Sequence, residues 1–352
     1  MDIDPNTQSI DRRSFLVKSS SLLAASLVGP KSYGRLERTT KPLKLGLISA
    51  ASYGYQNEPR TSGSTHGTAF ATTFNGWDET KAKQFNGKFV RSGRMLDAAR
   101  VVKIWDPDKD SARAIADICE IDTVTDTAEQ CCHNVDAVLI VDDGSGTHWK
   151  FADYPLRQGV PTFCDKPLAM TVIDATKVVK TVRNTGTPFM SASALRFVPD
   201  IVHLRQELPE IGDVHMASAV CGNELVYYGI HALSMLYAVL GKGALSTINV
   251  GSTGKNIVRI RFDKGRDALL IVSDKKTMRS GFQINLYGQK GWRSIIPDMS
   301  NYYSYLLEAF LEFVITGNEI VPVEEELEVI AVLEAAKLSL QTGREVQLSE
   351  LL

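Results

Sequence analysis

The sequence predicts an α/β protein: a doubly wound parallel sheet, followed by an α+β part with a mostly antiparallel sheet. Two observations favour this class. Between residues 41 and 194, short apolar runs alternate with helical segments, as in a parallel sheet covered on both faces. Beyond residue 195, strand-like runs follow one another, which is typical of antiparallel pairing. A length of 352 residues fits about two domains.

In the first part, each predicted strand is a short run rich in Val, Ile and Leu, and each predicted helix has apolar residues at helical spacing. The strands are expected at 43–49, 101–105, 135–141, 160–163 and 188–191. The helices are expected at 111–119, 148–159 and 172–185. This domain is expected to span 41–194.

In the second part, 195–352, alternating apolar residues predict strands at 214–220, 246–250, 257–262, 268–273 and 281–287. Helical spacing predicts helices at 229–240, 302–314 and 324–341.

The first crossover is unusually long, with an insertion at 53–97 that contains the aromatic segment 65–77. It follows the carboxyl end of a strand, so it is expected to be either an active-site lid or a surface decoration.

Residues 1–40 differ from the rest of the chain. Arg12, Arg13, Phe15 and Lys18, followed by a short apolar run, resemble a twin-arginine export signal. The run is too short to span a bilayer. We therefore expect a periplasmic or otherwise exported protein; if this segment is only a frayed basic terminus, the protein is cytoplasmic.

The charge balance gives no sign of a polyanionic partner. The formal net charge is -2 and the pI is about 6.3, which argues against nucleic acid as a partner. Five cysteines without a CxxC pair predict neither a disulfide framework nor a metal site.

The most informative motif is Cys164-Asp165-Lys166-Pro167-Leu168-Ala169. It places Lys166 at the carboxyl end of a predicted strand, where open parallel sheets bind their ligands. The alternative is a solvated lysine before a proline turn. Cys164 is expected to be inert packing.

Several segments appear in the order seen in the glucose-fructose oxidoreductase / inositol dehydrogenase family (Gfo/Idh/MocA), over roughly residues 43–345. The segment 165–169 resembles its Glu-Lys-Pro-Leu-Ala motif, 196–199 its Arg-x-x-Pro, and 229–231 its catalytic Gly-x-His. The resemblance implies a Rossmann-type dinucleotide-binding domain followed by a substrate and oligomerisation domain.

The resemblance also implies catalytic roles for Lys166 and His231, which would flank the carbon that exchanges a hydride with nicotinamide. Alcohol oxidation needs a base for the hydroxyl proton and positive charge near the developing alkoxide. Taken by itself, His231 would be interpreted as a satisfied helix histidine; its place after Lys166 in the family's motif order favours the catalytic role.

NAD is the expected cofactor, with NADP possible. Asp106, at the end of the second strand, would bind the adenosine ribose, or it is only a turn aspartate before a proline. The first turn keeps one glycine of the usual Gly-x-Gly-x-x-Gly pattern. The expected cofactor-binding residues are Ser49, Ala51, Gly54, Asp106, Asp143, His148, Asp165 and Lys166.

The chain departs from the family pattern around its histidine. Tyr227 and Ser234 stand where the family usually has aspartates, so the negative charge that would raise the basicity of His231 is missing. Asp143 replaces the family's common Thr-Pro and either lies near nicotinamide or caps the following helix.

The leading hypothesis is an NAD(P)-dependent oxidoreductase acting on a sugar, polyol or related carbohydrate, with a tightly held and recycled cofactor if the protein is exported. The alternative is a non-catalytic nucleotide- or sugar-binding module. Substrate contacts are expected from Arg196, Tyr227, Tyr228 and His231, although Arg196 could instead tie the two domains together. We expect a homo-oligomer through the C-terminal sheet.

Overall fold

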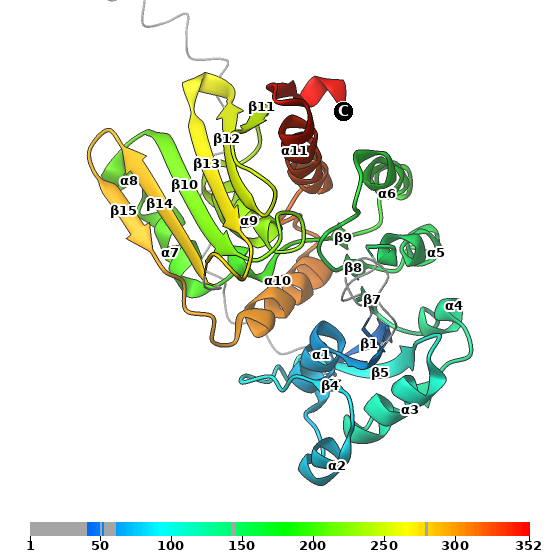
Figure 1. Cartoon of the computed structure of the whole chain (residues 1–352). Helices are drawn as coiled ribbons and strands as arrows, with labels where there is room; N and C mark the ends of the chain where they lie inside the picture. The colour runs from blue at the N-terminus through cyan, green and yellow to red at the C-terminus, as the bar shows by residue number, and fades with distance from the viewer. Residues whose placement is uncertain (1–40, 50, 53–60, 142–145, 279–280) are drawn as a thin grey trace, which may run out of the picture. The chain divides into compact units, whose positions relative to one another are not determined.

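Six parallel strands form the first sheet, in the order β6-β5-β1-β7-β8-β9 (Figure 1). The computed structural model describes residues 41–49, 51–52, 61–141, 146–278 and 281–352. The strands are β1 (Leu43–Ile48), β5 (Ala99–Trp105), β6 (Thr123–Val124), β7 (Ala137–Ile140), β8 (Thr162–Cys164) and β9 (Phe189–Met190). The predicted export signal, Gly54 and Asp143 lie outside the described residues. The order reverses direction at β1, whose neighbours are β5 and β7, and this is the doubly wound arrangement that the sequence predicts.

Helices connect these strands, and capping residues set their ends. The α-helices are α1 (Thr65–Asn75), α2 (Glu79–Gln84), α3 (Lys109–Ile118), α4 (Ala128–Cys131), α5 (Asp153–Arg157) and α6 (Val172–Thr185). Thr171 caps α6 by accepting a hydrogen bond from the backbone N–H of Asp174, and Gly186 ends it in the left-handed conformation. The helix predicted at 148–159 is instead a 3-10 turn, η1 (His148–Phe151), followed by the short α5.

The aromatic segment 65–77, expected to be a lid or a surface decoration, forms the buried helix α1. Its residues from Gly67 to Phe74 are buried, and it packs against β1, β5 and α10 (Tyr302–Thr316). It is therefore the core crossover helix that follows β1. A small sheet flanks it in the chain, with β2 (Ala51–Ser52) and β3 (Thr61–Ser64) before α1 and β4 (Lys88–Phe89) after it.

Seven strands form the second large sheet, in the order β15-β14-β10-β13-β12-β11-β16. They are β10 (Val214–Gly222), β11 (Ala244–Asn249), β12 (Lys255–Phe262), β13 (Asp267–Ser273), β14 (Phe282–Gly288), β15 (Trp292–Ile295) and β16 (Val346–Gln347). All neighbours are antiparallel except β10 and β13, which are parallel. The predicted class is thus confirmed, while β15 and β16 escaped prediction because each is too short for a clear alternation.

The second sheet buries one face against helices. Burial alternates strictly along β12, and the buried side contributes to a core shared with α9 (Gly229–Leu240) and α11 (Val323–Thr342). The remaining elements between the sheets are η2 (Ala194–Arg196), α7 (Pro199–Gln206) and α8 (Leu208–Ile211), and the short turns η3 (Asp263–Gly265) and η4 (Leu348–Glu350) lie later in the chain. The division into domains at residue 194 stays a prediction.

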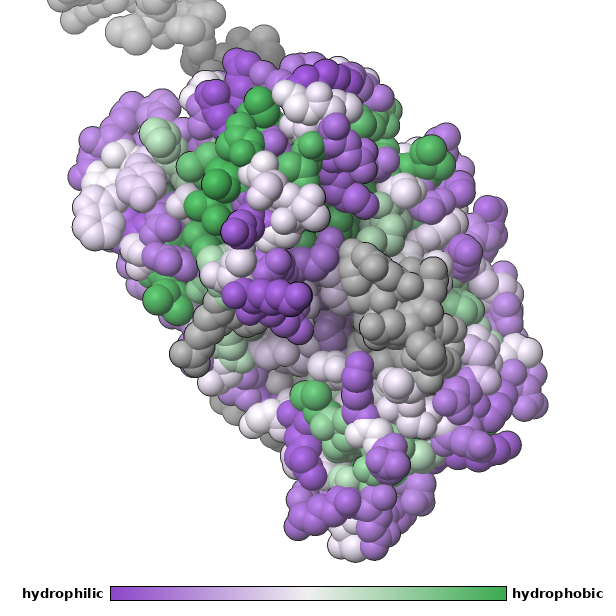
Figure 2. All heavy atoms as spheres, in the orientation of Figure 1, coloured by the Kyte–Doolittle hydropathy of each residue, from purple (hydrophilic) through white to green (hydrophobic). Residues whose placement is uncertain are grey.

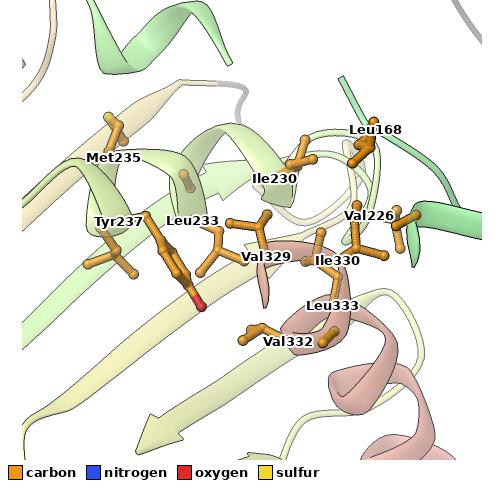
Figure 3. Close-up of a cluster of buried hydrophobic side chains, with 14 of the residues drawn as sticks. Leu168, Val226, Ile230, Leu233, Met235, Tyr237, Val329, Ile330, Val332 and Leu333 are labelled. Atoms are coloured by element: carbon orange, nitrogen blue, oxygen red, sulfur yellow. The ribbon is translucent and has the colours of Figure 1, made fainter. Parts of the chain in front are cut away.

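The core around α9 and α11 also anchors the motif that contains Lys166. Leu168 is fully buried and belongs to the same hydrophobic cluster as Ile230 of α9 and Ile330 of α11 (Figure 3). Because Leu168 lies two residues after Lys166, this packing fixes the backbone from which the lysine side chain extends.

Candidate active site

The carboxyl ends of four strands meet at one edge of the parallel sheet. The backbone N–H of Ser49 donates to the carbonyl of Trp105 at 2.7 Å, that of Val141 to Ile48 at 2.9 Å, and that of Asp165 to Ile140 at 2.9 Å. These bonds tie the residues that follow β1, β7 and β8 to one another and to β5. This edge includes the end of β1, where the strand order reverses and where ligands bind in such sheets.

The turn after β1 differs from the predicted one. Ser49 is buried with φ +94°, a conformation that favours glycine. Ala51 lies in β2, and Gly54 is outside the described residues. The helix begins only at Thr65, capped by Ser64. A Cβ atom on Gly67 would lie 3.0 Å from the carbonyl oxygen of Ser49, so the first turn of α1 lies directly against the end of β1.

Asp106 follows β5 and is fully buried. Its Oδ1 accepts a hydrogen bond from the backbone N–H of Asp108 at 2.7 Å, which is the turn role considered above. This contact is compatible with ribose binding, because a carboxylate accepts several hydrogen bonds. The cofactor role of Asp106 stays a prediction.

A histidine that sequence reasoning did not assign to the site lies beside the motif. His66, in the first turn of α1, contacts Oδ2 of Asp165 through its Nδ1. Asp165 is 2% exposed. Burial alone would raise the pKa of its carboxyl, but the charge and hydrogen bond of His66, with smaller effects from Lys166 and His148, lower the pKa below its ordinary value. Asp165 is therefore an ionised, buried carboxylate.

His148 also contacts this residue, at the backbone. Its Nε2 lies 2.6 Å from the carbonyl oxygen of Asp165. Because a carbonyl oxygen only accepts, Nε2 carries the proton and donates it. His148, which the sequence placed among the cofactor-binding residues, thus orients the backbone that precedes Lys166.

Lys166 is brought to the second half of the chain. Its side chain is 4% exposed, and Nζ lies 4.5 Å from the ring centroid of Tyr227 and 3.4 Å from the carbonyl oxygen of that residue. A cation over an aromatic face is stabilised electrostatically. The alternative of a solvated lysine is therefore wrong.

His231 lies in the first turn of α9. Its Nδ1 is 2.7 Å from the Oγ of Ser193, and its ring packs edge-on against Phe282 and Tyr228. Burial lowers the pKa of His231 well below its ordinary value, and the nearby charges of Lys166 and His66 lower it further. The imidazole is therefore neutral at neutral pH.

The family's aspartates are missing around His231, and its hydrogen-bond partner in the structure is a serine. Ser193 supplies a hydroxyl, so the histidine is oriented by a neutral group. Nothing in the local sequence marks Ser193, which lies 38 residues before His231 and meets it only in the fold. Tyr227 and Tyr228 are half-buried just before α9, and the Tyr227 N–H donates to Oε2 of Glu224 at 2.5 Å.

Arg196 has a structural partner. Its guanidinium is buried and forms an ion pair with Glu325 of α11, with Nη1 and Oε1 2.6 Å apart. Glu326 is also buried, and burial raises the pKa of its carboxyl to about 8. This ion pair gives Arg196 a structural role within the second part of the chain, since Glu325 also lies in 195–352. That Arg196 ties the two domains together stays a prediction.

Within the described residues, no group of three or more His, Cys, Asp or Glu side chains is arranged to hold a metal ion. No helix in the described ranges has both the length and the apolar character needed to cross a bilayer. A cavity of about 790 Å³ lies elsewhere, lined by residues that include Arg205, His215 and Lys290.

Comparisons with known proteins agree with this geometry. Residues 63–193 match the model of an oxidoreductase family with an NAD-binding Rossmann fold, GFO_IDH_MocA. An inositol 2-dehydrogenase of Gluconacetobacter diazotrophicus is 30% identical over 142 residues, which are 39% of this chain and 42% of that protein. A 2,7-anhydro-N-acetylneuraminate hydratase of Mediterraneibacter gnavus is 26% identical over 113 residues, or 32% of this chain and 30% of that one. The chain thus aligns with less than half the length of these relatives.

The fold extends further than the sequence similarity. The crystal structure of myo-inositol dehydrogenase from Lactobacillus casei, in complex with NAD(H) and myo-inositol, superposes with a TM-score of 0.69 and 16% identity, over 87% of this chain and 96% of that one. The predicted resemblance is confirmed: residues 63–193 match the Gfo/Idh/MocA oxidoreductase family model with its NAD-binding Rossmann fold, and the fold of the chain is that of the solved dehydrogenase structure.

Proposed function

We propose that this protein is an NAD-dependent oxidoreductase that acts on a secondary hydroxyl of a sugar, polyol or related carbohydrate. The observation that carries the proposal is the meeting of Lys166 and His231, from opposite halves of the chain. Lys166 lies against Tyr227, and its charge acts on the half-buried imidazole of His231. Such a pair of a cation and a neutral base is what alcohol oxidation requires.

The residues at the sheet edge fit a dinucleotide. The first turn of α1 abuts the end of β1, and a helix amino terminus favours phosphate. The Asp106 carboxylate follows β5 and suits ribose hydroxyls, which favours NAD over NADP. Ser49, Ala51, Gly54 and Asp143 remain cofactor-binding candidates. When bound, NAD supplies the hydride acceptor.

The protein's own groups handle the proton. For His231 to act as a base through Nε2, its Nδ1–H must donate to Ser193, whose Oγ is positioned to accept it. The ammonium of Lys166 then stabilises negative charge on the substrate oxygen as the proton leaves. The serine partner does not raise the basicity of His231 as a carboxylate would, so turnover is expected to rise with pH until His231 is fully neutral.

A carbohydrate substrate is supported by the relatives, two of which are named as inositol dehydrogenases. The half-buried rings of Tyr227 and Tyr228 lie beside the catalytic pair and offer apolar faces and hydroxyls to a sugar. Both are proposed as substrate contacts.

We also propose export by the twin-arginine route, on the basis of the Arg12-Arg13 motif. Free nicotinamide cofactor is scarce outside the cytoplasm, so an exported enzyme would hold NAD tightly and recycle it within one catalytic cycle. Fusing residues 1–40 to a reporter that is active only after export tests the export signal directly. Retention of the reporter in the cytoplasm would refute it.

A homo-oligomer through the second sheet is the proposed assembly. The face of this sheet opposite the helices carries exposed apolar side chains, and apolar residues gather over its strands in Figure 2. They include Met216, Ile257, Tyr287 and Trp292. Light scattering on the full chain and on a Trp292→Glu variant tests this, since a monomeric wild type would exclude it.

The decisive test of the enzyme proposal is mass spectrometry of nucleotide released when the purified full chain is denatured, followed by a screen of polyols for NAD reduction. We expect stoichiometric NAD and turnover of a cyclic polyol, with Lys166→Met lowering kcat/KM at least about 100-fold. Lys180→Met, a change of an exposed lysine on α6, is the control. Bound nucleotide without turnover would favour the non-catalytic binding module, and no binding of NAD or NADP by calorimetry would refute both.

A further inference from the structure

Asp165 and Lys166 are neighbours in the chain and both are buried, yet the carboxylate pairs with another residue. Asp165 contacts Nδ1 of His66, whereas the ammonium of Lys166 lies over the ring of Tyr227. A buried carboxylate is strongly destabilised without a partner. With His66 on the carboxylate, the Lys166 side chain extends to the ring and the carbonyl oxygen of Tyr227 in the second part of the chain.

His66 is held firmly in this position. It belongs to the first turn of α1, whose following residues are buried, and its ring packs 5.0 Å from that of Tyr303 on α10. The ring of Phe70, one turn later, lies 6.4 Å from His66 and packs in turn on Phe163 of β8. Helix α1, helix α10 and strand β8 thus fix the imidazole beside Asp165.

We propose that His66 is a positioning residue for catalysis, which takes up the Asp165 carboxylate and so keeps the ammonium of Lys166 oriented toward the substrate and His231. This inference rests on the proposed function. Among the described residues, His66 contacts Asp165 and Tyr303 of α10 and its charge reaches His231 of α9, while Lys166 and His148 act on the Asp165 carboxylate that it contacts.

The arrangement has a consequence that can be measured without substrate. The charge of His66 contributes to the low pKa of His231, so its removal raises that pKa. The Asp165 carboxylate, left without His66, would also draw Lys166 away from Tyr227. Both effects make His231 easier to protonate and reduce the charge available to the alkoxide.

The test compares His66→Gln, which keeps a hydrogen-bond donor but carries no charge, with His215→Gln, which changes an exposed histidine on β10. Histidine NMR titration of the full chain without substrate should show a higher pKa of His231 in His66→Gln and an unchanged one in the control. The acid limb of the pH profile of kcat/KM should move up by the same amount, with kcat reduced about tenfold.

An unchanged titration of His231 in folded His66→Gln would overturn the proposal. If the wild type turned over no polyol, the proposed function would fail while the titration still tested the role of His66. If His66→Gln did not fold, NMR of the wild-type chain would test the proposal instead. We expect a slowly exchanging, strongly downfield Nδ1 proton on His66. Rapid exchange of that proton would refute the pairing with Asp165.

Discussion

The buried group formed by Arg196, Glu325 and Glu326 predicts how stability depends on pH. Two carboxyls share one guanidinium: Glu325 takes the ion pair at 2.6 Å, and neither carboxylate oxygen of Glu326 has a hydrogen-bond partner among the described residues. Burial raises the pKa of Glu326 to about 8, with repulsion from Glu325 added and attraction to Arg196 opposing. Glu326 is therefore protonated in the folded protein at neutral pH.

The direction of the pH dependence follows from the difference between the pKa values of Glu326 in the folded and the unfolded chain. In the unfolded chain Glu326 ionises at its ordinary pKa of 4.5, and in the folded protein at about 8. The stabilisation is therefore complete below pH 4.5, is lost as the pH rises from 4.5 to 8, and is constant above that. At about 1.4 kcal/mol per pKa unit, the difference of roughly 3.5 between the two pKa values corresponds to a loss of about 5 kcal/mol over this window, as an upper figure.

Glu326→Gln removes this titration while preserving the shape of the side chain. Urea unfolding followed by tryptophan fluorescence between pH 5 and 8.5 should show the free energy of unfolding falling with pH more steeply in the wild type than in the variant. Glu129→Gln, a change of an exposed carboxyl on α4, should keep the wild-type slope. Equal slopes in the wild type and Glu326→Gln would show that Glu326 is ionised in the folded protein.

Three further changes test the packing around the site. Arg196→Met leaves Glu325 buried without its cation and should lower the free energy of unfolding by about 3–5 kcal/mol in urea titrations; a loss of substrate affinity with unchanged stability would instead restore Arg196 as a substrate residue. Leu233→Ala opens a cavity in the fully buried α9 core and should cost about 2–5 kcal/mol by the same measurement, whereas a cost near zero would contradict close packing there. Gly63→Ala forces a side chain onto φ +75°, with its Cβ 2.1 Å from the carbonyl oxygen of Lys88, and should lower the thermal midpoint and weaken NAD binding in calorimetry; wild-type values of both would refute the close approach of β3 to β4 beside α1.

Much of the fold follows from local patterns. The strands β5, β10 and β13 and the helices α9 and α11 were predicted within a few residues because apolar periodicity and flanking glycines mark them. The crossover helix α1 was not recognised. Four of its 11 residues are Thr, which has a low helix propensity, so its helical signal is weak, and its burial comes from contacts with β1, β5 and α10.

Some residues of the candidate site were likewise predicted from local motifs, and others were not. Lys166 and His231 were found from motifs, because each lies in a short segment with a fixed local pattern. His66 and Ser193 were missed, since each is an isolated polar residue whose partner, Asp165 or His231, lies 99 or 38 residues away. No spacing rule connects residues so far apart.

By itself, the sequence determined the fold class, the resemblance to the Gfo/Idh/MocA family and the two residues expected to handle the proton, because these depend on local periodicity and on motifs of a few residues. Only the tertiary structure decided which groups surround them: His66 on Asp165, Tyr227 under Lys166, Ser193 on His231, and Glu325 on Arg196. Such pairings depend on which elements are brought together when the chain buries its apolar surface, and the charge and pKa of each site residue follow from those neighbours.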